Sequence, residues 1–369
     1  MNKVCLVGYG NTKFSRENIS IDSLLLSATK SLFEQNTNLN QKDIDAVIVS
    51  TNDNTKYLAA ILSEIAGIKP KIAHTVESLC NSGANSTVSA YSYIASGLAK
   101  VVLVVGAERY DSPGQILDWD KSRGEFKHPI FWGSIFTKSH KRKFGTTEEE
   151  LAIVSAKNHK NAQENPHAYS HKNYTVEELL NSKKLTEDLK VSDCSRSCTG
   201  ASAILLASED ISKKFSSHPV KIKGIGQKTV SAGFTKNANF SCMQSTVDAG
   251  KMAYEMAGIK ASDVDVAEIH DAFTVCELMA LEDLGFVSHG KGAKYVKNLF
   301  DTENRKINPR GGLIGSGHPL GATGIAQIIE ILQQLQGVAG KRQVENCKVG
   351  LVHNMSAAAT SSTVLLLES

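Results

Sequence analysis

A cysteine in the first quarter of the chain has the surroundings expected of a nucleophile. Cys80 follows the apolar run Ile72–Val76 and precedes a stretch of small residues, Ser82–Asn85, that predicts the start of a helix. At a helix start, unpaired backbone N–H groups and the positive end of the helix dipole favour the thiolate, the form of cysteine that attacks a carbonyl carbon. The alternative is a small buried residue, which is the usual role of a single cysteine.

A glycine-rich segment near the end of the chain confines a histidine. The segment Gly311–Gly324 reads GGLIGSGHPLGATG and holds six glycines in fourteen residues. His318 lies between Gly317 and Pro319, directly before a predicted helix, so its position is restricted. We interpret His318 as a base or an oxyanion donor, with Gly317 as backbone support. A tight loop without a chemical role is the alternative.

Two further histidines follow apolar runs of strand length. His270 begins the sequence HDAF directly after Val264–Ile269, and His353 comes directly after Val349–Val352. Open α/β sheets bind their ligands at the carboxyl ends of the strands. Either histidine alone could simply cap its strand by bonding to the backbone. Together with the cysteine and the histidine described above, however, they indicate one reactive site.

Three other signals are weaker. Gly8-Tyr9-Gly10 follows a strand-like run but lacks the third glycine of a dinucleotide-binding loop, because Lys13 takes that place. Cys194 and Cys198 have no partners at metal-ligand spacing, so we expect buried thiols. The third signal is a run of positive residues that contains Lys138, Lys141, Arg142 and Lys143. Such a run usually forms a solvent-exposed face, although it would also suit a phosphate-bearing cofactor.

The elements that must position these residues alternate between strand and helix, which predicts an α/β fold. The expected strands are Val4–Val7, Ala46–Val49, Ile72–Val76, Val101–Val105, Ala201–Ala207, Val220–Ile225, Val264–Ile269, Val349–Val352 and Thr363–Leu367. The expected helices are Ile21–Phe33, Ala59–Ala66, Gly83–Ser96 and Thr246–Ala257, with one more after Phe273 and one after Gly321.

The segment 111–190 interrupts this alternation. It holds both tryptophans, many Lys and Glu residues and few apolar runs, so it is predicted to be an insertion. Outside it the chain repeats itself, because Lys42–Val49 and Ser262–Ile269 each lead acidic residues into a strand, and each half ends in two strands. We expect one half at residues 1–110 plus 191–215, an inserted domain at 111–190 and a second half at 216–369.

Length and composition exclude several classes of protein. The chain has 369 residues, enough for about two domains, and its net charge of +3 makes no general case for a nucleic-acid partner. Its seven cysteines form neither a disulfide framework nor CxxC pairs, so no metal or redox cofactor is expected. No apolar run approaches the roughly 20 residues of a membrane-spanning helix, and the first residues do not resemble a signal peptide. We therefore expect a cytoplasmic protein without a membrane partner.

Four motifs together resemble the thiolase family, most closely its sterol-carrier-protein-like and archaeal acetoacetyl-CoA thiolase branch. They are VESLCNSGANS around Cys80, HDAF at His270, GGLIGSGHPLGATG around His318, and the pair HN at His353. The resemblance covers nearly the whole chain. It implies two duplicated βαβαβαββ halves packed in five layers, αβαβα, with an inserted loop domain that binds coenzyme A.

The same resemblance implies a role for each motif. Cys80 would accept the acyl group, and His318 would activate Cys80 and help to stabilise the thioester oxyanion. His270 stands where the broader family often has the Asn that fixes an oxyanion water. Because the positive run at residues 138–143 lies in the inserted segment, we expect it near the phosphates of coenzyme A.

The chain departs from the broader family at the second catalytic cysteine. Ala272 and Asn354 (or His353) stand in the places that can hold it, so the proton transfer that forms an enolate must fall to a histidine. His318 is already committed to the cysteine. We favour His353 over His270, whose oxyanion role would need a donor N–H and leave it a poor base.

The family's glycines after HN are also absent, because the chain continues as Met355-Ser356-Ala357-Ala358-Ala359. The backbone N–H of Ser356 could still bind an oxyanion, and Asn354 would support the same region. Any positive φ in this stretch would cost about 1 kcal/mol or more for a residue with a Cβ atom.

The expected function is acetyl-CoA C-acetyltransferase, a Claisen condensation of two acetyl-CoA molecules by ping-pong transfer through acyl-Cys80. The coenzyme A thioester is the substrate, and no metal or redox cofactor is involved. One alternative is a thiolase-like enzyme for another carbon–carbon bond, such as a retro-aldol lyase, although lyases tend to lack the cysteine. Another is a non-catalytic acyl-CoA-binding scaffold, and a nicotinamide-dependent dehydrogenase is a distant third.

The resemblance also implies partners. It suggests a homodimer or a homotetramer. In the archaeal branch it further suggests a small zinc-ribbon OB-fold partner, which bridges to an acyl-CoA synthase of the same pathway.

Overall fold

The computed structural model describes residues 2–112, 116–233, 236 and 239–369. Its strands are β1 Val4–Asn11, β2 Ala46–Ser50, β3 Ile72–Val76, β4 Val101–Glu108, β5 Gly200–Ser208, β6 Val220–Thr229, β7 Val266–Glu268, β8 Val349–Met355 and β9 Ser361–Glu368. The helices of the two halves are α1 Ile21–Gln35, α2 Leu58–Ile65, α3 Ser82–Ala95, α7 Glu209–Ser212, α8 Gln244–Ala257, α9 Thr274–Asp283, α10 Gly292–Asp301, α11 Gly312–Ser316 and α12 Leu320–Gln336. Between β4 and β5 lie α4 Pro129–Phe144, α5 Glu148–Ala162 and α6 Val176–Leu180.

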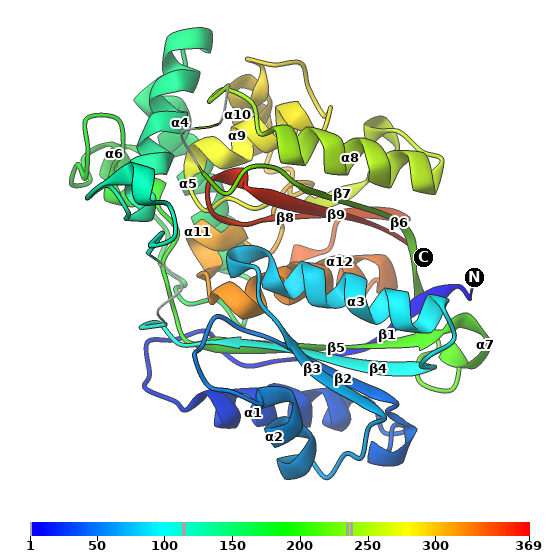
Figure 1. Ribbon diagram of the computed structural model, residues 1–369. Coiled ribbons are helices and arrows are strands. Elements are labelled where there is room, and N and C mark those ends of the chain that lie inside the picture. Colours follow the sequence, from blue (N-terminus) through cyan, green and yellow to red (C-terminus); the bar gives the residue numbers. More distant parts are fainter. Residues whose placement is uncertain (1, 113–115, 234–235, 237–238) are drawn as a thin grey trace.

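The elements stack in five layers, as the resemblance implied (Figure 1). Helices α1 and α2 cover one sheet, α3 and α12 lie between the two sheets, and α8 and α9 cover the other. The strands form one nine-stranded sheet in the order β3-β2-β4-β5-β1-β6-β9-β8-β7. In the described part of the chain, its two halves are joined by a short antiparallel pairing of β1 with β6. The sheet can therefore enclose the two central helices on both sides.

The strand order repeats between the halves. β2 pairs in parallel with β4, and β7 pairs in the same way with β8. The acidic residues that revealed the repeat also have equivalent contacts. Asp45 accepts hydrogen bonds from the backbone of Lys100 and Val101 at the start of β4, and Asp265 does the same for Lys348 and Val349 at β8. The internal repeat is thus a repeat of structure.

The second half keeps the expected order of elements with shorter strands. Where the first half has β3, the second has a single parallel bridge between Ala267 and Ile307. β7 itself is only three residues long. The chain at Ile307 pairs at one residue and then turns towards the glycine-rich segment.

β1 also differs from the expectation. It continues through Gly8-Tyr9-Gly10, so these residues form strand and not a phosphate-binding turn. A Cβ atom on Gly10 would lie 2.4 Å from the backbone nitrogen of Leu32 in α1. The glycine therefore allows helix α1 to approach the sheet closely, which removes the structural basis for the dinucleotide interpretation.

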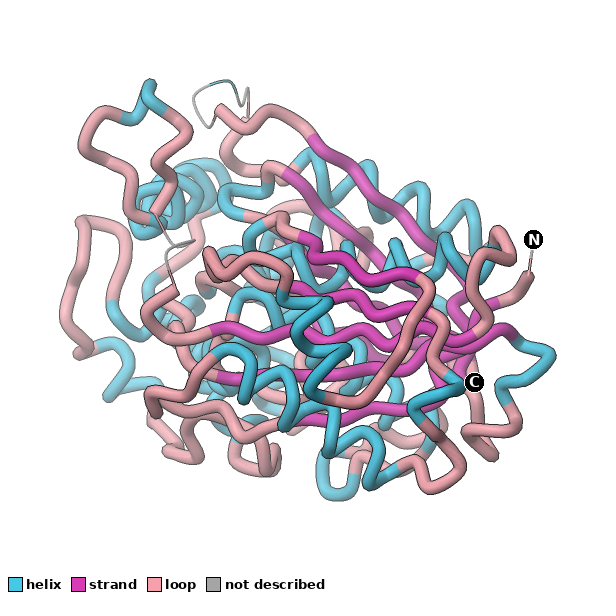
Figure 2. The backbone as a smooth tube through the Cα atoms, turned by 60° about the horizontal axis from the view of Figure 1, so that its bottom comes forward, coloured by secondary structure: helices cyan, strands magenta, loops and turns pink. Residues whose placement is uncertain are grey.

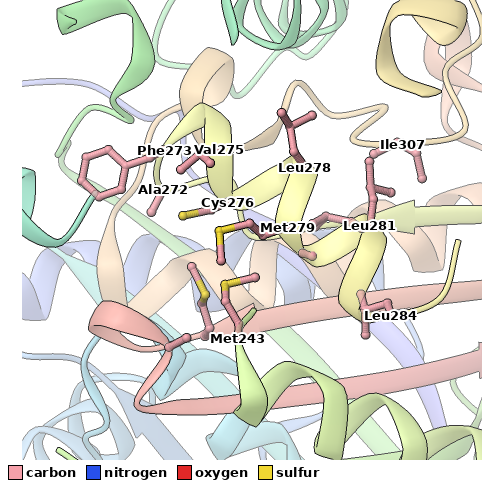
Figure 3. Packing of buried hydrophobic residues seen from close by; sticks show 14 of the residues in the cluster. Met243, Ala272, Phe273, Val275, Cys276, Leu278, Met279, Leu281, Leu284 and Ile307 are labelled. Carbon is pink, nitrogen blue, oxygen red and sulfur yellow. The ribbon is translucent and has the colours of Figure 1, made fainter. Parts of the chain in front are cut away.

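The second half has an apolar core between α8, α9 and the sheet. Figure 3 shows Met243, directly before α8, beside Met279 of α9. Phe273, directly before the first residue of α9, points towards the inserted helices. All ten residues of α9 are buried. A helix buried on every side is held rigidly, and this rigidity extends to the HDAF segment that precedes it.

The inserted helices lie at the end of the molecule opposite the chain termini (Figure 1). Strands run through the middle of the molecule, with helices and loops around them (Figure 2). Among the described residues, no helix has both the length and the apolar character needed to cross a membrane.

Candidate active site

One cavity brings together residues from all three parts of the chain. Cys80 comes from the turn before α3, His318 from the turn before α12, and Ala272 and Phe273 from the HDAF segment. The cavity has a volume of about 120 Å³. Its other lining residues are Leu79, Leu117, His128, Pro129, Ile130, Trp132, Cys194, Ser195, Ser197, Leu320 and Ala357.

The packing of the two central helices explains why Cys80 and His318 meet. α3 and α12 lie side by side between the sheets, and each carries its reactive residue just before its first turn. A Cβ atom on Gly83 would lie 2.9 Å from the backbone nitrogen of Ile325, so the two backbones approach more closely than any larger residue would allow. The Cys80 sulfur and one ring nitrogen each of His270 and His318 lie within 4.8 Å of one another.

His318 is held in a tautomer that leaves one nitrogen free to accept a proton. Its Nδ1 lies 2.7 Å from the hydroxyl of Thr323, and that hydroxyl donates to the backbone oxygen of Pro319 at 2.9 Å. The Thr323 oxygen must therefore accept from Nδ1–H. The other nitrogen, Nε2, is buried without a partner among the described residues. Burial and the charge of Arg310 lower the pKa of His318 to about 3, so the imidazole is neutral.

His270 has the opposite tautomer. Its Nδ1 accepts a hydrogen bond from the side-chain amide of Asn354 at 3.1 Å, and the same amide nitrogen donates to Gln327 at 2.8 Å. The proton of neutral His270 is therefore on Nε2, which makes this residue a donor. Burial lowers the pKa of His270 well below its usual value. Its ring stands perpendicular to that of His318, with the centroids 5.2 Å apart.

The structure separates His353 from this group. β8 continues to Met355, so His353 and Asn354 lie within the strand and point to opposite faces of the sheet. Asn354 faces α12 and the cavity side, whereas the Nε2 atom of His353 contacts Thr246 of α8 at 3.1 Å. His353 is completely buried and does not line the cavity. Burial lowers its pKa to about 3.

The backbone N–H of Ser356, expected to bind an oxyanion, and that of Gly317, expected to give backbone support, are both occupied. The N–H of Ser356 donates to Ser361, and that of Gly317 donates to Leu313. Gly317 instead has a φ of 93°, which allows the chain to turn into His318. Ala357 lines the cavity, and its own N–H has no hydrogen-bond partner among the described residues.

Strained alanines stand where the resemblance led us to expect glycines. Ala358 has a φ of 57° and Ala359 a φ of 54°. This left-handed conformation costs an alanine about 1 to 2 kcal/mol. The turn keeps its shape despite the cost, because both residues are buried in the core beside α8.

Cys80 differs from the expectation in its ionisation. It lies in a 3₁₀ turn, Leu79–Asn81, directly before α3. Burial raises the pKa of its thiol to about 12, and the carboxylates of Glu108 and Glu77 add to the rise. The resting residue is therefore a thiol and not a thiolate, since the loss of hydration outweighs the helix dipole. A base must remove its proton during attack.

Buried polar contacts fix the HDAF segment. Asp271 accepts hydrogen bonds from the backbone of Leu313 at 2.6 Å and from Asn158 of α5 at 2.7 Å. Lys157 of α5 forms a buried ion pair with Glu277 of α9, with a nitrogen–oxygen distance of 2.9 Å. The inserted helices are thereby tied to the second half next to His270.

The positive run divides between two faces of α4. Lys138, Arg142 and Lys143 line an open hollow of about 400 Å³, together with Ile135, Ser139 and Phe240. Lys141 lies on another face, where its Nζ atom is 3.1 Å from Asp188. Positions three and four apart share one helix face, so the fold groups only three of the four cations. Lys138 in turn pairs with Glu187 at 3.1 Å.

Some site residues were not found from the sequence. Cys194 was expected to be buried, but an isolated bridge to Phe273 brings it to the cavity wall, where it is half-buried. Thr323 and Gln327 lie one and two turns into α12, and their roles depend on which side chains face them. Only the spacing of Thr323 from His318 could have suggested its contact. Cys198 is buried, as expected.

The chemistry available in this cavity is acyl transfer. A thiol lies beside a neutral imidazole with a free lone pair and a second imidazole with a free N–H. Groups of these kinds can act as a nucleophile, a base and an oxyanion donor. Among the described residues, no Asp, Glu, Lys or Arg side chain lines the cavity wall, so a thioester rather than an ionic group fits next to the thiol.

Comparisons with known proteins agree with this chemistry. The family models described as "Thiolase, N-terminal domain" and "Thiolase C-terminal domain-like" match residues 4–210 and 226–369. An acetyl-CoA acetyltransferase of Methanothermobacter thermautotrophicus is 31% identical over 379 residues, which cover 99% of each chain. Sterol carrier protein 2 of Bos taurus is 33% identical over 96% of this chain and 70% of its own length.

The fold has close neighbours among solved structures. The structure described as the Ltp2-ChsH2(DUF35) aldolase superposes with a TM-score of 0.87 over 100% of this chain and 98% of that chain. Its sequence identity is 22%, so this likeness concerns the fold alone.

Proposed function

Because the chain belongs to the thiolase family and is an acyltransferase, we propose that it joins two acetyl-CoA molecules into acetoacetyl-CoA. One observation carries the proposal most directly. Cys80 and His318 line one cavity, and a ring nitrogen of His270, which has the opposite tautomer, lies within 4.8 Å of the Cys80 sulfur and of a His318 ring nitrogen. A ping-pong Claisen condensation needs a nucleophile, a base and an oxyanion donor of this kind.

In the first half-reaction the Cys80 sulfur attacks the thioester carbonyl while His318 Nε2 accepts its proton. A sulfur–carbon bond to Cys80 forms, and the carbon–sulfur bond to coenzyme A breaks. The leaving thiolate takes the proton back from His318. The N–H of Ala357 and that of Cys80 itself are the donors that we assign to the oxyanion, in place of Ser356.

In the second half-reaction His318 Nε2 takes a proton from the α-carbon of the incoming acetyl-CoA. His270 donates its Nε2–H to the enolate oxygen, and the carbanion attacks the acyl carbon. As the new carbon–carbon bond forms, the bond to Cys80 breaks and its thiolate receives the proton held by His318. His318 accepts and returns the proton in both half-reactions, so a second cysteine is not required as a base.

Mass spectrometry after incubation with acetyl-CoA tests the proposal. One acetyl group should appear on Cys80, and a second acetyl-CoA should release it as acetoacetyl-CoA. A protein that binds acetyl-CoA without becoming acetylated would be a scaffold. A protein that acetylates but cleaves or forms a different carbon–carbon bond would be another thiolase-like enzyme.

The cavity wall favours a second candidate, the same chemistry on a larger acyl group. Leu117, Ile130, Trp132 and Phe273 provide an apolar lining, and the two aromatic rings meet edge to face with centroids 4.7 Å apart. Apolar contacts of this kind stabilise a longer acyl chain by about 0.8 kcal/mol per buried methylene. A kcat/KM that rises from acetyl-CoA to butyryl-CoA would favour this candidate.

The hollow lined by Lys138, Arg142 and Lys143 is assigned to the phosphates of coenzyme A. α4 carries both this hollow and Trp132, and the helix rises about 16 Å between Trp132 and Lys143. An extended pantetheine arm can span such a distance. Arg142 and Lys143 form no ion pair among the described residues, so their charge is available to a ligand.

We predict that neutralising Arg142 and Lys143 together, by substitution with Gln, raises the KM for acetyl-CoA about tenfold with little change in kcat. These contacts would exist in both the ground state and the transition state. Steady-state kinetics at low salt measures the effect. Lys141→Gln, which removes one positive charge from another face of the same helix, is the matched control for the single variant Arg142→Gln. An equal rise in KM for the control would reject the assignment.

Substitution of His270 and of His353 should affect the rate of the second half-reaction differently. His270→Ala is predicted to form acetyl-Cys80 normally but to condense it about 10² to 10³ times more slowly, the scale of losing one oxyanion donor. His353→Gln keeps a partner for Thr246 and should condense near the wild-type rate. Single-turnover assays of each half-reaction separate the two. Slow condensation in His353→Gln alone would restore the sequence-based assignment of the base to His353.

Assembly remains part of the proposal. A homodimer or homotetramer and a small zinc-ribbon OB-fold partner are consistent with the family. The fold neighbour named above carries a DUF35 component in its own description. Co-purification of the chain with a protein encoded beside it tests the partner.

A further inference from the structure

A second cluster of reactive side chains lies away from the cavity, between the start of α8 and the loop after α9. Cys242 precedes α8, Asp283 ends α9, and His289 lies in the loop before α10. The Cys242 sulfur, an Asp283 oxygen and a His289 ring nitrogen lie within 4.8 Å of one another. His289 Nε2 is 3.0 Å from Asp283 Oδ1. None of the three takes part in the chemistry described above.

The carboxylate in this cluster lacks a permanent counter-charge. The Asp283 side chain is fully buried, and among the described residues no Lys or Arg forms an ion pair with it. Its Oδ2 accepts the backbone N–H of Met243 at 2.7 Å, and its Oδ1 lies 3.0 Å from Nε2 of His289. Buried carboxylates are normally paired with a cation or bound to a metal ion. His289 supplies a charge only when it is protonated.

We propose that Cys242, Asp283 and His289 bind a divalent cation of borderline softness, for which Zn²⁺ is the natural probe. A thiolate, an imidazole and a carboxylate are the three side-chain ligands that zinc takes in proteins, and three protein ligands leave the fourth position for water. The His289 side chain is 49% exposed, so that position can face solvent. On binding, the Cys242 thiol releases its proton to solvent as the sulfur–metal bond forms.

The surroundings hold the three ligands in place. Phe286 and Val287 pack against the apolar core and anchor the loop that carries His289. The neighbouring Glu282 points elsewhere, because it bonds to His140 and to the backbone of Gly292. Lys143 and Asp248 are the other charges that act on Cys242, and they oppose each other. A bound cation would therefore link the start of α8 to the end of α9.

The site also adjoins the positive hollow. Phe240, two residues before Cys242, lines that hollow, and the hydroxyl of Ser241 lies 2.9 Å from that of Ser139 in α4. A cation held by Cys242 would fix this wall of the hollow. The inference does not depend on the proposed reaction, because the ligands are outside the cavity that contains Cys80.

Titration of the full chain with Co²⁺ tests the site, because cobalt bound to a thiolate has an intense near-ultraviolet charge-transfer band. The Cys80→Ser variant is the background, since Cys80, His270 and His318 also lie close enough to bind a metal. The band should appear with one equivalent of Co²⁺ in this background and disappear when Cys242→Ser is added. Cys347→Ser is the matched control, because Cys347 is equally half-buried but belongs to neither cluster.

A second measurement uses Zn²⁺ and the variant His289→Ala, which changes a half-exposed side chain. Calorimetric titration in the same background should give one site, and His289→Ala should weaken Zn²⁺ binding at least about tenfold. Zn²⁺ should also raise the Tm of the background but not that of the Cys242→Ser variant. Persistence of the cobalt band without Cys242 would overturn the proposal. The absence of any bound metal in the Cys80→Ser background would overturn it equally.

Discussion

The Cys80→Ser variant is expected to lose acyl transfer by at least about a thousandfold, the scale on which enzymes lose activity with their nucleophile. Serine keeps the volume of the side chain, but its hydroxyl is a far weaker nucleophile and a poorer leaving group than a thiol. Binding of coenzyme A should change little, because the residues assigned to its phosphates lie on α4. Intact-mass measurement after incubation with acetyl-CoA should detect one acetyl group on the wild type and none on the variant.

Cys194→Ser is the control for this result. Cys194 lines the same cavity, so its substitution tests whether a second thiol there carries the acyl group. It should remain acetylated at Cys80 and active. Acetylation that persists in Cys80→Ser and disappears in Cys194→Ser would transfer the nucleophile's role to Cys194.

His318→Ala is expected to slow both half-reactions by about 10² to 10⁴, the usual contribution of a general acid–base group. Cys80 needs this base because its thiol has a pKa of about 12. Rapid-quench measurement of acetyl-Cys80 formation and of its condensation checks both steps. A His318→Ala enzyme that acetylates normally and fails only in condensation would show that another group activates Cys80.

Thr323→Val tests the tautomer of His318 without removing the base. Valine has a similar shape to threonine but cannot accept the Nδ1 proton. The loss of one buried hydrogen bond corresponds to about a tenfold loss of rate, with the KM unchanged. A purely structural role for Thr323 would lower the Tm but leave the rate of the folded enzyme intact.

Local sequence signals singled out Cys80, His270 and His318, which the fold brings together, because residues at strand ends and helix starts have short-range signatures. Cys80 and His318 stand before helices that begin within two residues of them, and glycines mark both segments. His270 follows a recognisable buried strand. Each of these positions depends on a few neighbours in the chain, so pattern and spacing were sufficient to locate it.

The errors concern properties that depend on distant packing. His353 was expected to face the cavity, but β8 extends three residues beyond the apolar run and places it on the other face of the sheet. Ser356 was expected to offer a free N–H, but this group donates a hydrogen bond to Ser361 in the turn that leads into β9. Lys141 belongs to the positive run in the sequence, yet the helix turns it towards Asp188.

The sequence by itself determined the α/β class and the duplication, and it singled out Cys80, His270 and His318, which the fold brings within 4.8 Å of one another. Periodicity and local motifs encode these features. Only the tertiary structure decided which groups carry a proton and to which side each side chain points. Burial turns the expected thiolate of Cys80 into a thiol. A hydrogen bond donated by His318 to Thr323, and one that His270 accepts from Asn354, give the two histidines opposite tautomers. The cluster around Asp283 is likewise a product of the fold. Desolvation and hydrogen-bond partners arise from residues far apart in the chain, and no local pattern records them.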